Sequence, residues 1–311
     1  MERRFDVLGV GQNSLDRVVF VDGPPSDPEA PEAPDGLELP GGQVATAVLA
    51  CARLGLRTAY VGAVGDDGAA EVVLEPLRRA GVDLSGVRTI PGARTRSALI
   101  SVERQSGERH VRPRRDPRLV LAPEAIDAAQ LAAARAVHLD AEHPQAAIRA
   151  AGLARAAGAA VLLDLDQPGR ELEDLLAMAD FPIVSERFAE WISGMGSAER
   201  GLSELVARGA RLAVVTLGPR GALAQGARDA EPLRSEAFRV EARDTTGAGD
   251  VFHAAFAFGL LQGWGRLRVL RAANAAAALC CRAVGAQGAL PSRTELETFL
   301  AAEAARDGGG R

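Results

Sequence analysis

The segment 244–250, with the sequence DTTGAGD, precedes the helical run VFHAAFAFGLL and carries the residue types that phosphate chemistry needs. Its glycines allow a tight turn that presents the N–H groups of Gly247, Ala248 and Gly249 at the start of a helix, where the helix dipole attracts an anion. Asp250 falls in the first helical turn beside that anion, where its carboxylate can accept the proton of an attacking hydroxyl. An aspartate at a helix start can also do no more than stabilise the helix, but the complete block favours phosphoryl transfer.

The basic residues limit how phosphate can be held. All 36 are arginines, because the chain contains no lysine. This excludes the lysine of a Walker-A loop, the lysine of a protein kinase and every Schiff-base mechanism, including those of pyridoxal phosphate. Arginines, backbone amides and a metal must therefore handle phosphate. A net charge of -5 and an aromatic content of 4% argue against nucleic acid as a partner.

The cysteines and the apolar runs indicate the compartment. Cys280 and Cys281 are neighbours in a helical pattern, and Cys51 lies among apolar residues, so no disulfide framework is expected. No run of about 18 uncharged apolar residues occurs, and the first residues lead directly into a strand-like segment. We expect a cytoplasmic protein with no membrane partner.

Buried strands alternate with helices from about residue 130 onward, which predicts the α/β class with a central, mostly parallel sheet flanked by helices. The C-terminal third is helical and should cover that sheet. The expected strands are 136–140, 159–166, 181–185 and 211–218, and the expected helices include 143–157, 170–178 and 294–303.

Two segments interrupt this alternation. Residues 17–23 and 97–113 are expected to form short strands with charged outward faces. The second segment is expected to contain two strands joined by a hairpin with Ser106-Gly107 at its tip. We expect a single domain over 1–311, with a small β-sheet lid from about 14–40 and 95–115 inserted in it. An exposed lid edge invites pairing with a second subunit, which predicts a homodimer.

Segment 244–250 resembles the carboxy-terminal signature of the PfkB, or ribokinase-like, carbohydrate kinase family, and the resemblance covers nearly the whole chain. The start GVGQNSLDRVVF is similar to the family's first strand and substrate aspartate. Gly41-Gly42 before QVATAVLACARLG resembles the amino-terminal signature, and VVTLGPRGAL (214–223) the nucleotide-binding turn. GGQVATA, LLDLD and SER look closest to the branch of sulfofructose kinase and ketohexokinase.

The resemblance implies ATP-dependent phosphorylation of a hydroxymethyl group of a small sugar, with Asp250 as general base and the Gly-Ala-Gly turn as anion hole. It implies ATP and Mg²⁺ as cofactors and leaves open a monovalent-cation requirement. The implied substrate contacts are Asp16, Gly42, Gln43, Thr46, Arg114 and Asp250. The implied ATP contacts are Thr216, Gly218, Gly221, Asp244, Thr245, Gly247, Gly249 and Asn274.

The sequence departs from the family pattern at two places. Thr46 stands where the family usually has asparagine, so an amide contact to substrate becomes a hydroxyl. The usual Asn-x-x-Glu motif falls on 185–188, which leaves Glu186 and Glu190 as the expected metal carboxylates.

Arg112, Arg114 and Arg115 follow the predicted lid hairpin, and clustered guanidinium groups suit a phosphate or carboxylate on the substrate. A solvated arginine face is the favoured explanation of these residues, because arginine is abundant throughout the chain. Where a sulfonate-binding arginine would be expected, after residue 140, the chain has Ala141-Glu142-His143. We therefore do not assign a sulfosugar as the substrate.

Four alternative assignments fit the sequence less well. A nucleoside kinase of the same fold needs an aromatic lid contact, and the lid offers only Phe20. A catalytically silent sugar- or nucleotide-binding regulator would have no use for Asp250. Residues 9–14 partly resemble a dinucleotide-binding fingerprint, but strand-like residues follow them where that motif requires a helix. A metal cluster of His138, Asp140 and His143 is disfavoured because His143 begins the next helix.

Overall fold

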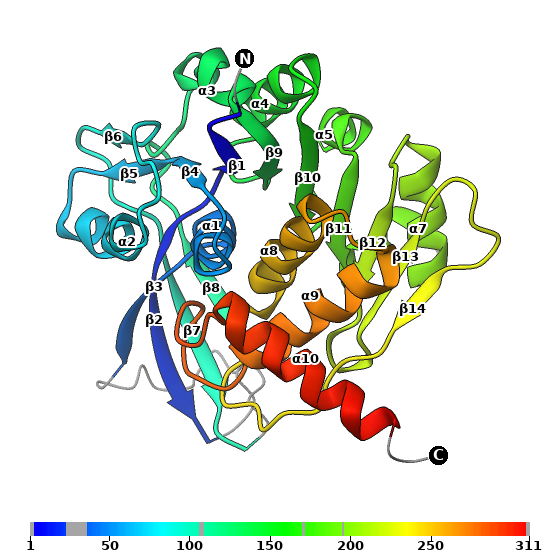
Figure 1. The fold of residues 1–311 in the computed structure, drawn as a ribbon. Helices are drawn as coiled ribbons and strands as arrows, with labels where there is room; N and C mark the ends of the chain where they lie inside the picture. Colours follow the sequence, from blue (N-terminus) through cyan, green and yellow to red (C-terminus); the bar gives the residue numbers. More distant parts are fainter. Residues whose placement is uncertain (1–2, 23–35, 106–108, 170–171, 195, 309–311) are drawn as a thin grey trace.

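The computed structural model describes residues 3–22, 36–105, 109–169, 172–194 and 196–308, and its centre is an eight-stranded sheet (Figure 1). Six neighbouring strands run parallel, and the last two add antiparallel at one edge. In spatial order the strands are β14 (Leu233–Ser235), β13 (Ala222–Gln225), β12 (Ala213–Thr216), β11 (Phe181–Ser185), β10 (Ala160–Leu165), β9 (Ala134–Leu139), β1 (Phe5–Val10) and β4 (Thr58–Val61).

Helices cover both faces of this sheet, and each face has its own hydrophobic core. On one face lie α3 (Ala128–Ala132), α4 (Pro144–Ala156), α5 (Glu173–Met178), α6 (Glu186–Ser193) and α7 (Ala198–Ala207). On the other lie α1 (Gln43–Arg53), α2 (Gly68–Arg79), α8 (Ala248–Leu261), α9 (Arg266–Cys280) and α10 (Arg293–Gly308). Two 3₁₀ turns, η1 (Pro123–Ala125) and η2 (Gly218–Arg220), complete the helical elements.

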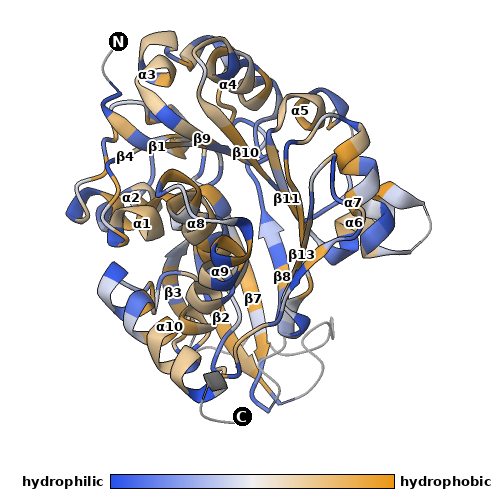
Figure 2. Cartoon of the chain, turned by 45° about the vertical axis from the view of Figure 1, so that its right-hand side comes forward, coloured by the Kyte–Doolittle hydropathy of each residue, from blue (hydrophilic) through white to orange (hydrophobic). Residues whose placement is uncertain are grey.

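The central strands are apolar on both faces, as Figure 2 shows for the sheet interior. In β1, Leu8 and Val10 enter one core while Val7 enters the other. A strand buried on two sides needs a continuous apolar run, which is the pattern that predicted the parallel sheet. The predicted α/β class is confirmed.

Four strands form a second, smaller sheet beside the large one. Their order is β3 (Leu37–Gly41), β2 (Ser14–Val21), β7 (Ser97–Glu103) and β8 (Arg109–Arg114). Val18, Ile100 and Val102 give this sheet a small core of its own. The predicted strands at 17–23 and 97–113 therefore exist, whereas the hairpin tip at Ser106-Gly107 and part of the first lid segment (23–35) lie outside the described residues. A two-stranded sheet pairs β5 (Ala63–Gly65) with β6 (Arg88–Ile90).

Helix α8 is enclosed by protein between its first and last turns. Its residues from Val251 to Gly259 are all buried, so the apolar run VFHAAFAFG has no solvent-facing side. The helix begins at Gly247, whose φ of 81° lies in the left-handed region. A Cβ on Gly247 would also lie 2.5 Å from the carbonyl oxygen of Ala286, so only glycine fits there.

The last helix is longer than the sequence predicted, since α10 continues to residue 308 rather than ending near 303. Within the described ranges, none of the helices combines the length and apolar character that a bilayer crossing requires.

Candidate active site

A buried carboxylate shapes the loop in front of α8. Asp244 is fully buried, and its Oδ1 accepts hydrogen bonds from the N–H and the hydroxyl of Thr246 at 2.8 and 2.6 Å. Its Oδ2 accepts a third from the N–H of Gly285 at 2.8 Å. Both oxygens are thus committed to the protein. Asp244, predicted as an ATP contact, would act by holding the loop in shape.

The amides of the predicted anion hole are not equivalent. The N–H of Ala248 donates to the carbonyl oxygen of Thr245 at 3.3 Å. Gly249 is exposed, a Cβ built on it meets nothing within 4 Å, and no hydrogen bond within the described part of the chain uses its N–H. The backbone at Gly249 therefore faces open space at the positive end of the α8 dipole.

Asp250 follows in the first turn of α8 and is half-buried. Burial raises the pKa of its carboxyl well above the usual value, and the negative charge of Asp164 adds to the rise. The guanidinium of Arg109 opposes it. A carboxyl group with a raised pKa is a stronger base once it has lost its proton, which suits proton abstraction from a hydroxyl.

Arg109 comes from the small sheet and reaches the loop before α8. Its Nη1 donates a hydrogen bond to Thr245 Oγ1 at 3.0 Å, between residues 136 positions apart. Arg109 was not predicted as a site residue, unlike the three arginines that follow it, because nothing in the spacing of β8 distinguishes it. Arg114, the predicted substrate contact, is exposed on the same strand.

Asp16 lies on β2, close enough for its charge to contribute to the raised pKa of Asp250. It is only 6% exposed, and the hydroxyl of Ser14 donates to its Oδ1 at 2.6 Å. Burial raises the pKa of Asp16, while Ser14 and then Arg96 and Arg109 favour the charged form. The structure thus brings the predicted substrate aspartate and the predicted base to one region.

The start of α1 closes against the same region. Gly42 has a φ of 98°, and a Cβ on it would lie 2.4 Å from the Cα of Asn13, so this glycine permits a close backbone approach. Gln43 is half-buried at the first position of the helix. Thr46 is fully buried, and its hydroxyl accepts a hydrogen bond from Nε2 of Gln287 at 3.4 Å. Thr46 thus faces protein, although its neighbours Gly42 and Gln43 stay predicted contacts.

A compact ion cluster lies beside the substrate region. Glu142 Oε2 is 3.3 Å from Arg96 Nε and 2.9 Å from Arg115 Nη2, with Arg96 and Glu142 both nearly buried. Asp140 is also buried and accepts hydrogen bonds from the N–H groups of Gln12 and Glu142 at 2.8 and 2.9 Å. Burial, with the charge of Glu142 second, raises the pKa of Asp140 to about 7. The charge of Arg115 is thus already paired within the protein.

The predicted nucleotide turn spans β12, η2 and β13. Thr216 Oγ1 donates to the carbonyl oxygen of Val184 at 3.3 Å, and Gly218 is exposed with a φ of 57°. Gly221 is buried, and a Cβ on it would lie 2.0 Å from the carbonyl oxygen of Ser235, so its smallness serves packing. Of the two glycines in this turn, Gly218 is the one whose backbone is open.

Asn274 on α9 is buried and holds the chain after β14. Its Nδ2 donates to the carbonyl oxygen and the hydroxyl of Ser235, both at 3.0 Å, and to the carbonyl oxygen of Glu236 at 3.2 Å. An adenine contact through Nδ2 would compete with these three bonds. Asn274 therefore positions a loop, whatever it contacts besides.

The predicted metal carboxylates lie on α6. Glu186 pairs with Arg220 of the nucleotide turn, while Glu190, one turn later, is exposed. Asp166, directly after β10, is exposed as well, and its charge adds to the raised pKa of Asp250. Sequence reasoning missed Asp166, although its place after a parallel strand was a usable signal.

Similarity to known proteins identifies the family. The sequence matches the pfkB family carbohydrate kinases over residues 5–293. This chain belongs to that family. It is 32% identical over 293 residues to fructokinase-1 of Oryza sativa subsp. japonica, an alignment that covers 85% of this chain and 89% of the relative.

Solved structures agree with the match. Ribokinase from Thermotoga maritima superposes on this pfkB kinase with a TM-score of 0.82 at 26% identity, covering 96% of this chain and 99% of the other. Arabidopsis thaliana ribokinase complexed with ribose and ATP gives a TM-score of 0.80 at 25% identity and the same coverage. The chain is accordingly an ATP-dependent carbohydrate kinase, and the ribokinase-like fold predicted from the sequence is confirmed.

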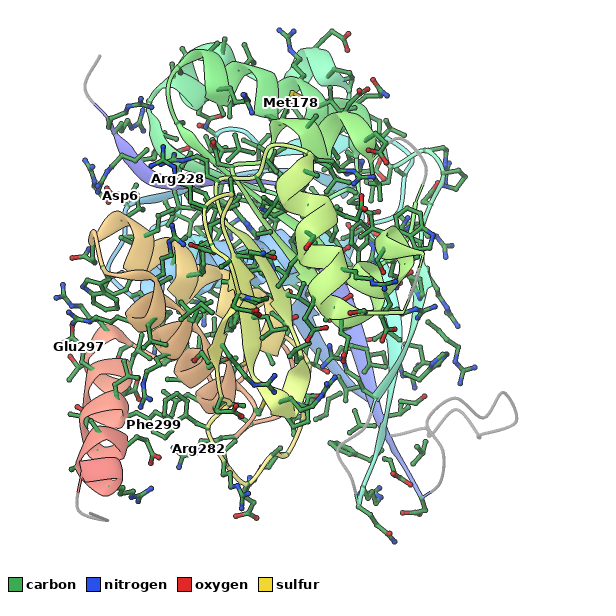
Figure 3. The ribbon with its side chains drawn as sticks, turned by 90° about the vertical axis from the view of Figure 1, so that its right-hand side faces the viewer. Asp6, Met178, Arg228, Arg282, Glu297 and Phe299 are labelled. Carbon is green, nitrogen blue, oxygen red and sulfur yellow. The ribbon has the colours of Figure 1, made fainter. Side chains whose placement is uncertain are left out.

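A groove of about 1260 Å³ lies elsewhere on the kinase. It runs between α10 and the helices beside it, where Figure 3 labels Arg282 and Phe299, two of its lining residues. None of the residues that line it belongs to segment 244–250.

The disfavoured metal cluster of His138, Asp140 and His143 does not form as drawn. His143 caps the start of α4, and its Nδ1 accepts a hydrogen bond from the N–H of Leu121 at 3.4 Å. His138 instead meets Asp164 and His253. Helical spacing could have shown one part of this, because His253 follows Asp250 by three residues and lies on the same side of α8.

Proposed function

We propose that this kinase transfers the γ-phosphoryl group of ATP to a primary hydroxyl of a small sugar, with Asp250 as the general base. The observation that carries the proposal is the position of Asp250 in the first turn of α8. There it lies next to the unpaired Gly249 amide and within the electrostatic reach of Asp16 on the small sheet. A base, an anion-binding amide and a hydroxyl-binding carboxylate thus occupy one region.

The reaction then follows from the chain's own groups. Asp16 orients the sugar by accepting hydrogen bonds from two hydroxyls, and Asp250 accepts the proton of a third as its oxygen approaches the γ-phosphorus. The Gly249 amide and the α8 dipole stabilise the charge on the transferring group. Ser14 and the arginines near Asp16 oppose the rise in its pKa that burial causes, and so favour the charged, accepting form.

Magnesium fits the donor set on the ATP side. Asp166 and Glu190 are exposed carboxylates, and oxygen ligands are what Mg²⁺ prefers. Glu186 suits this role less well, because it is engaged with Arg220. When bound, Mg²⁺ neutralises phosphate charge and orients the γ-phosphoryl group.

The small sheet would act as a lid over the sugar. Arg109 provides the physical link, since its hydrogen bond to Thr245 closes the sheet against the loop that bears the anion site. Closure excludes water, which would otherwise compete with the sugar for the phosphoryl group. The edge strands β3 and β8 also expose Leu37 and Val111, which favours a homodimer through this sheet.

A nucleoside kinase is the second candidate, and the lid disfavours it. Phe20 is the only aromatic residue predicted for the lid, and its ring already packs with the small core and carries the guanidinium of Arg104 at 5.4 Å. A base could stack there only by displacing Arg104. Sugar without an attached base fits better.

The test is ATP consumption by the purified protein across ketoses, aldoses, sugar acids, sugar phosphates and ribosides. We expect turnover on a sugar class and little on ribosides. Turnover on ribosides alone would establish the nucleoside kinase, and bound ATP with no turnover on any compound would favour a silent binding protein.

A further inference from the structure

Three potential metal ligands meet beneath the proposed base. His138 comes from β9, Asp164 from β10 and His253 from α8, and they are 2%, 7% and 3% exposed. One ligand atom of each lies within 4.8 Å of the others. The two imidazole rings are 5.0 Å apart at an angle of 49°. These three residues are here called the His-Asp-His cluster. They are separated by 26, 89 and 115 positions in the chain, so the fold alone brings them together.

Several nitrogen atoms of the cluster have no hydrogen-bond partner in the described part of the chain. Neither ring nitrogen of His138 has a hydrogen-bond partner among the described residues, and neither does Nδ1 of His253. Nε2 of His253 lies 3.3 Å from Asp164 Oδ1. Buried imidazole nitrogens are normally paired, so the two unpaired ring nitrogens of His138, one of which carries a free lone pair, point to an additional species between the rings.

The donor set identifies the kind of species. Two imidazoles and one carboxylate suit zinc and its neighbours among the divalent first-row metals, and not Mg²⁺, which prefers oxygen alone. Burial favours the neutral imidazole, which is the form that binds metal. We propose that His138, Asp164 and His253 bind one divalent transition-metal cation, with zinc as the reference ion.

The distances between the three ligand atoms allow one ion to bind after small movements of the side chains. A tetrahedral ion with bonds of about 2.0 to 2.1 Å holds its ligand atoms about 3.4 Å apart. The His253–Asp164 distance of 3.3 Å already matches, and the widest pair of ligand atoms must approach by roughly 1.4 Å or less. Rotation of the side chains can supply this. Three protein ligands leave the fourth position to water.

The site would tie the catalytic helix to the sheet. His253 lies one turn after Asp250 on α8, while His138 and Asp164 belong to adjacent central strands. A cation bound by all three would fix the start of α8 relative to β9 and β10. Binding to the folded chain alone raises its stability by mass action, which gives a readout independent of kinase activity.

The experiment uses the full chain, freed of metal with a chelator and dialysed. Zn²⁺ or Co²⁺ is then titrated, with stoichiometry followed by calorimetry, Co²⁺ coordination by its visible spectrum, and stability by thermal unfolding. We expect one ion per chain, the visible bands of four-coordinate Co²⁺, and a higher unfolding midpoint. Excess Mg²⁺ should not displace the ion.

Two variants remove a ligand and one serves as control. His138→Gln and Asp164→Asn should weaken binding by more than the roughly 10- to 100-fold that loss of an outer-shell partner costs, and should abolish the stability shift. His110→Gln removes an exposed histidine of β8 and should bind as the wild type does. If His138→Gln fails to fold, Asp164→Asn decides, since the amide keeps the shape of the carboxyl group.

Wild-type protein that binds no ion, or that binds equally well after both substitutions, would overturn the proposal. Binding lost in His110→Gln and retained in Asp164→Asn would also overturn it, because the ion would then lie on the surface.

Discussion

Arg109 of strand β8 donates a hydrogen bond of 3.0 Å to Thr245, two residues before the glycine at which α8 begins. The contact joins the small sheet to the loop that carries the proposed anion site. It also places a positive charge where it lowers the pKa of Asp250 against the effect of burial. One side chain therefore couples the lid to the base.

Removing this arginine should impair turnover in a pH-dependent manner. In Arg109→Gln, the lost hydrogen bond should lower kcat/KM about fivefold, the equivalent of about 1 kcal/mol. Because the base must be deprotonated and loses a nearby cation, the acidic limb of the pH profile should move to higher pH. Arg104→Gln, a lid arginine that pairs with Asp22, is the matched control. An unmoved acidic limb would contradict the coupling.

Gly249→Ala should separate folding from catalysis. The methyl group meets no protein atom within 4 Å, and alanine favours a helix over glycine by about 1 kcal/mol, so stability should be kept or improved. The same methyl group would fill part of the open space beside this backbone, where the phosphoryl group is proposed to bind, and should lower kcat about 100-fold or more. Gly68→Ala, an equally open position at the start of α2, controls for the helix effect. Full activity in Gly249→Ala would remove this amide from the mechanism.

Asp140 should make stability depend on pH. Its pKa is about 7 in the folded chain against 3.8 in the unfolded one, so the folded state binds more protons between these values. The stability contributed by the protonated form is complete below pH 3.8 and is lost as the pH rises towards 7, by about 1.4 kcal/mol per pKa unit. Asp140→Asn mimics the protonated form.

Urea unfolding of both proteins between pH 4 and 8 measures this. As the pH rises, the free energy of unfolding of the variant should increase relative to that of the wild type. This difference should level off above about pH 7. Two parallel curves would show that Asp140 keeps an ordinary pKa.

Asn274→Ala should destabilise the chain by about 1 to 3 kcal/mol, because three acceptors in the 235–236 segment lose their donor. Chemical denaturation measures the loss, with the exposed amide of Gln262→Ala as control. If Asn274 served adenine alone, stability would be unchanged and only the KM for ATP would rise.

Much of this architecture could be read from the sequence, since continuous apolar strands such as 159–166 and the glycines of 244–250 have few structural alternatives. Local patterns also located Asp250, because its place at a helix start depends only on neighbouring residues. What escaped were specific side-chain contacts made across the fold. Arg109 contacts Thr245, which lies 136 positions further along the chain. His138 of β9 contacts His253 of α8.

The same limit affected the residues taken from the family resemblance. Thr46 and Asn274 occupy the expected positions, but the structure shows their side chains engaged by Gln287 and by the Ser235 segment. A residue's position in a motif does not reveal which neighbour already holds its polar atoms. Only the packed structure does.

The most direct test of the mechanism is the rate of Asp250→Asn on the sugar that the wild type turns over, measured beside Asp174→Asn, an exposed aspartate in the first turn of α5. Loss of a general base should lower kcat about 10²- to 10⁴-fold while ATP still binds and Asp174→Asn stays active. A kcat for Asp250→Asn close to that of the wild type would contradict the central claim that this carboxylate activates the hydroxyl.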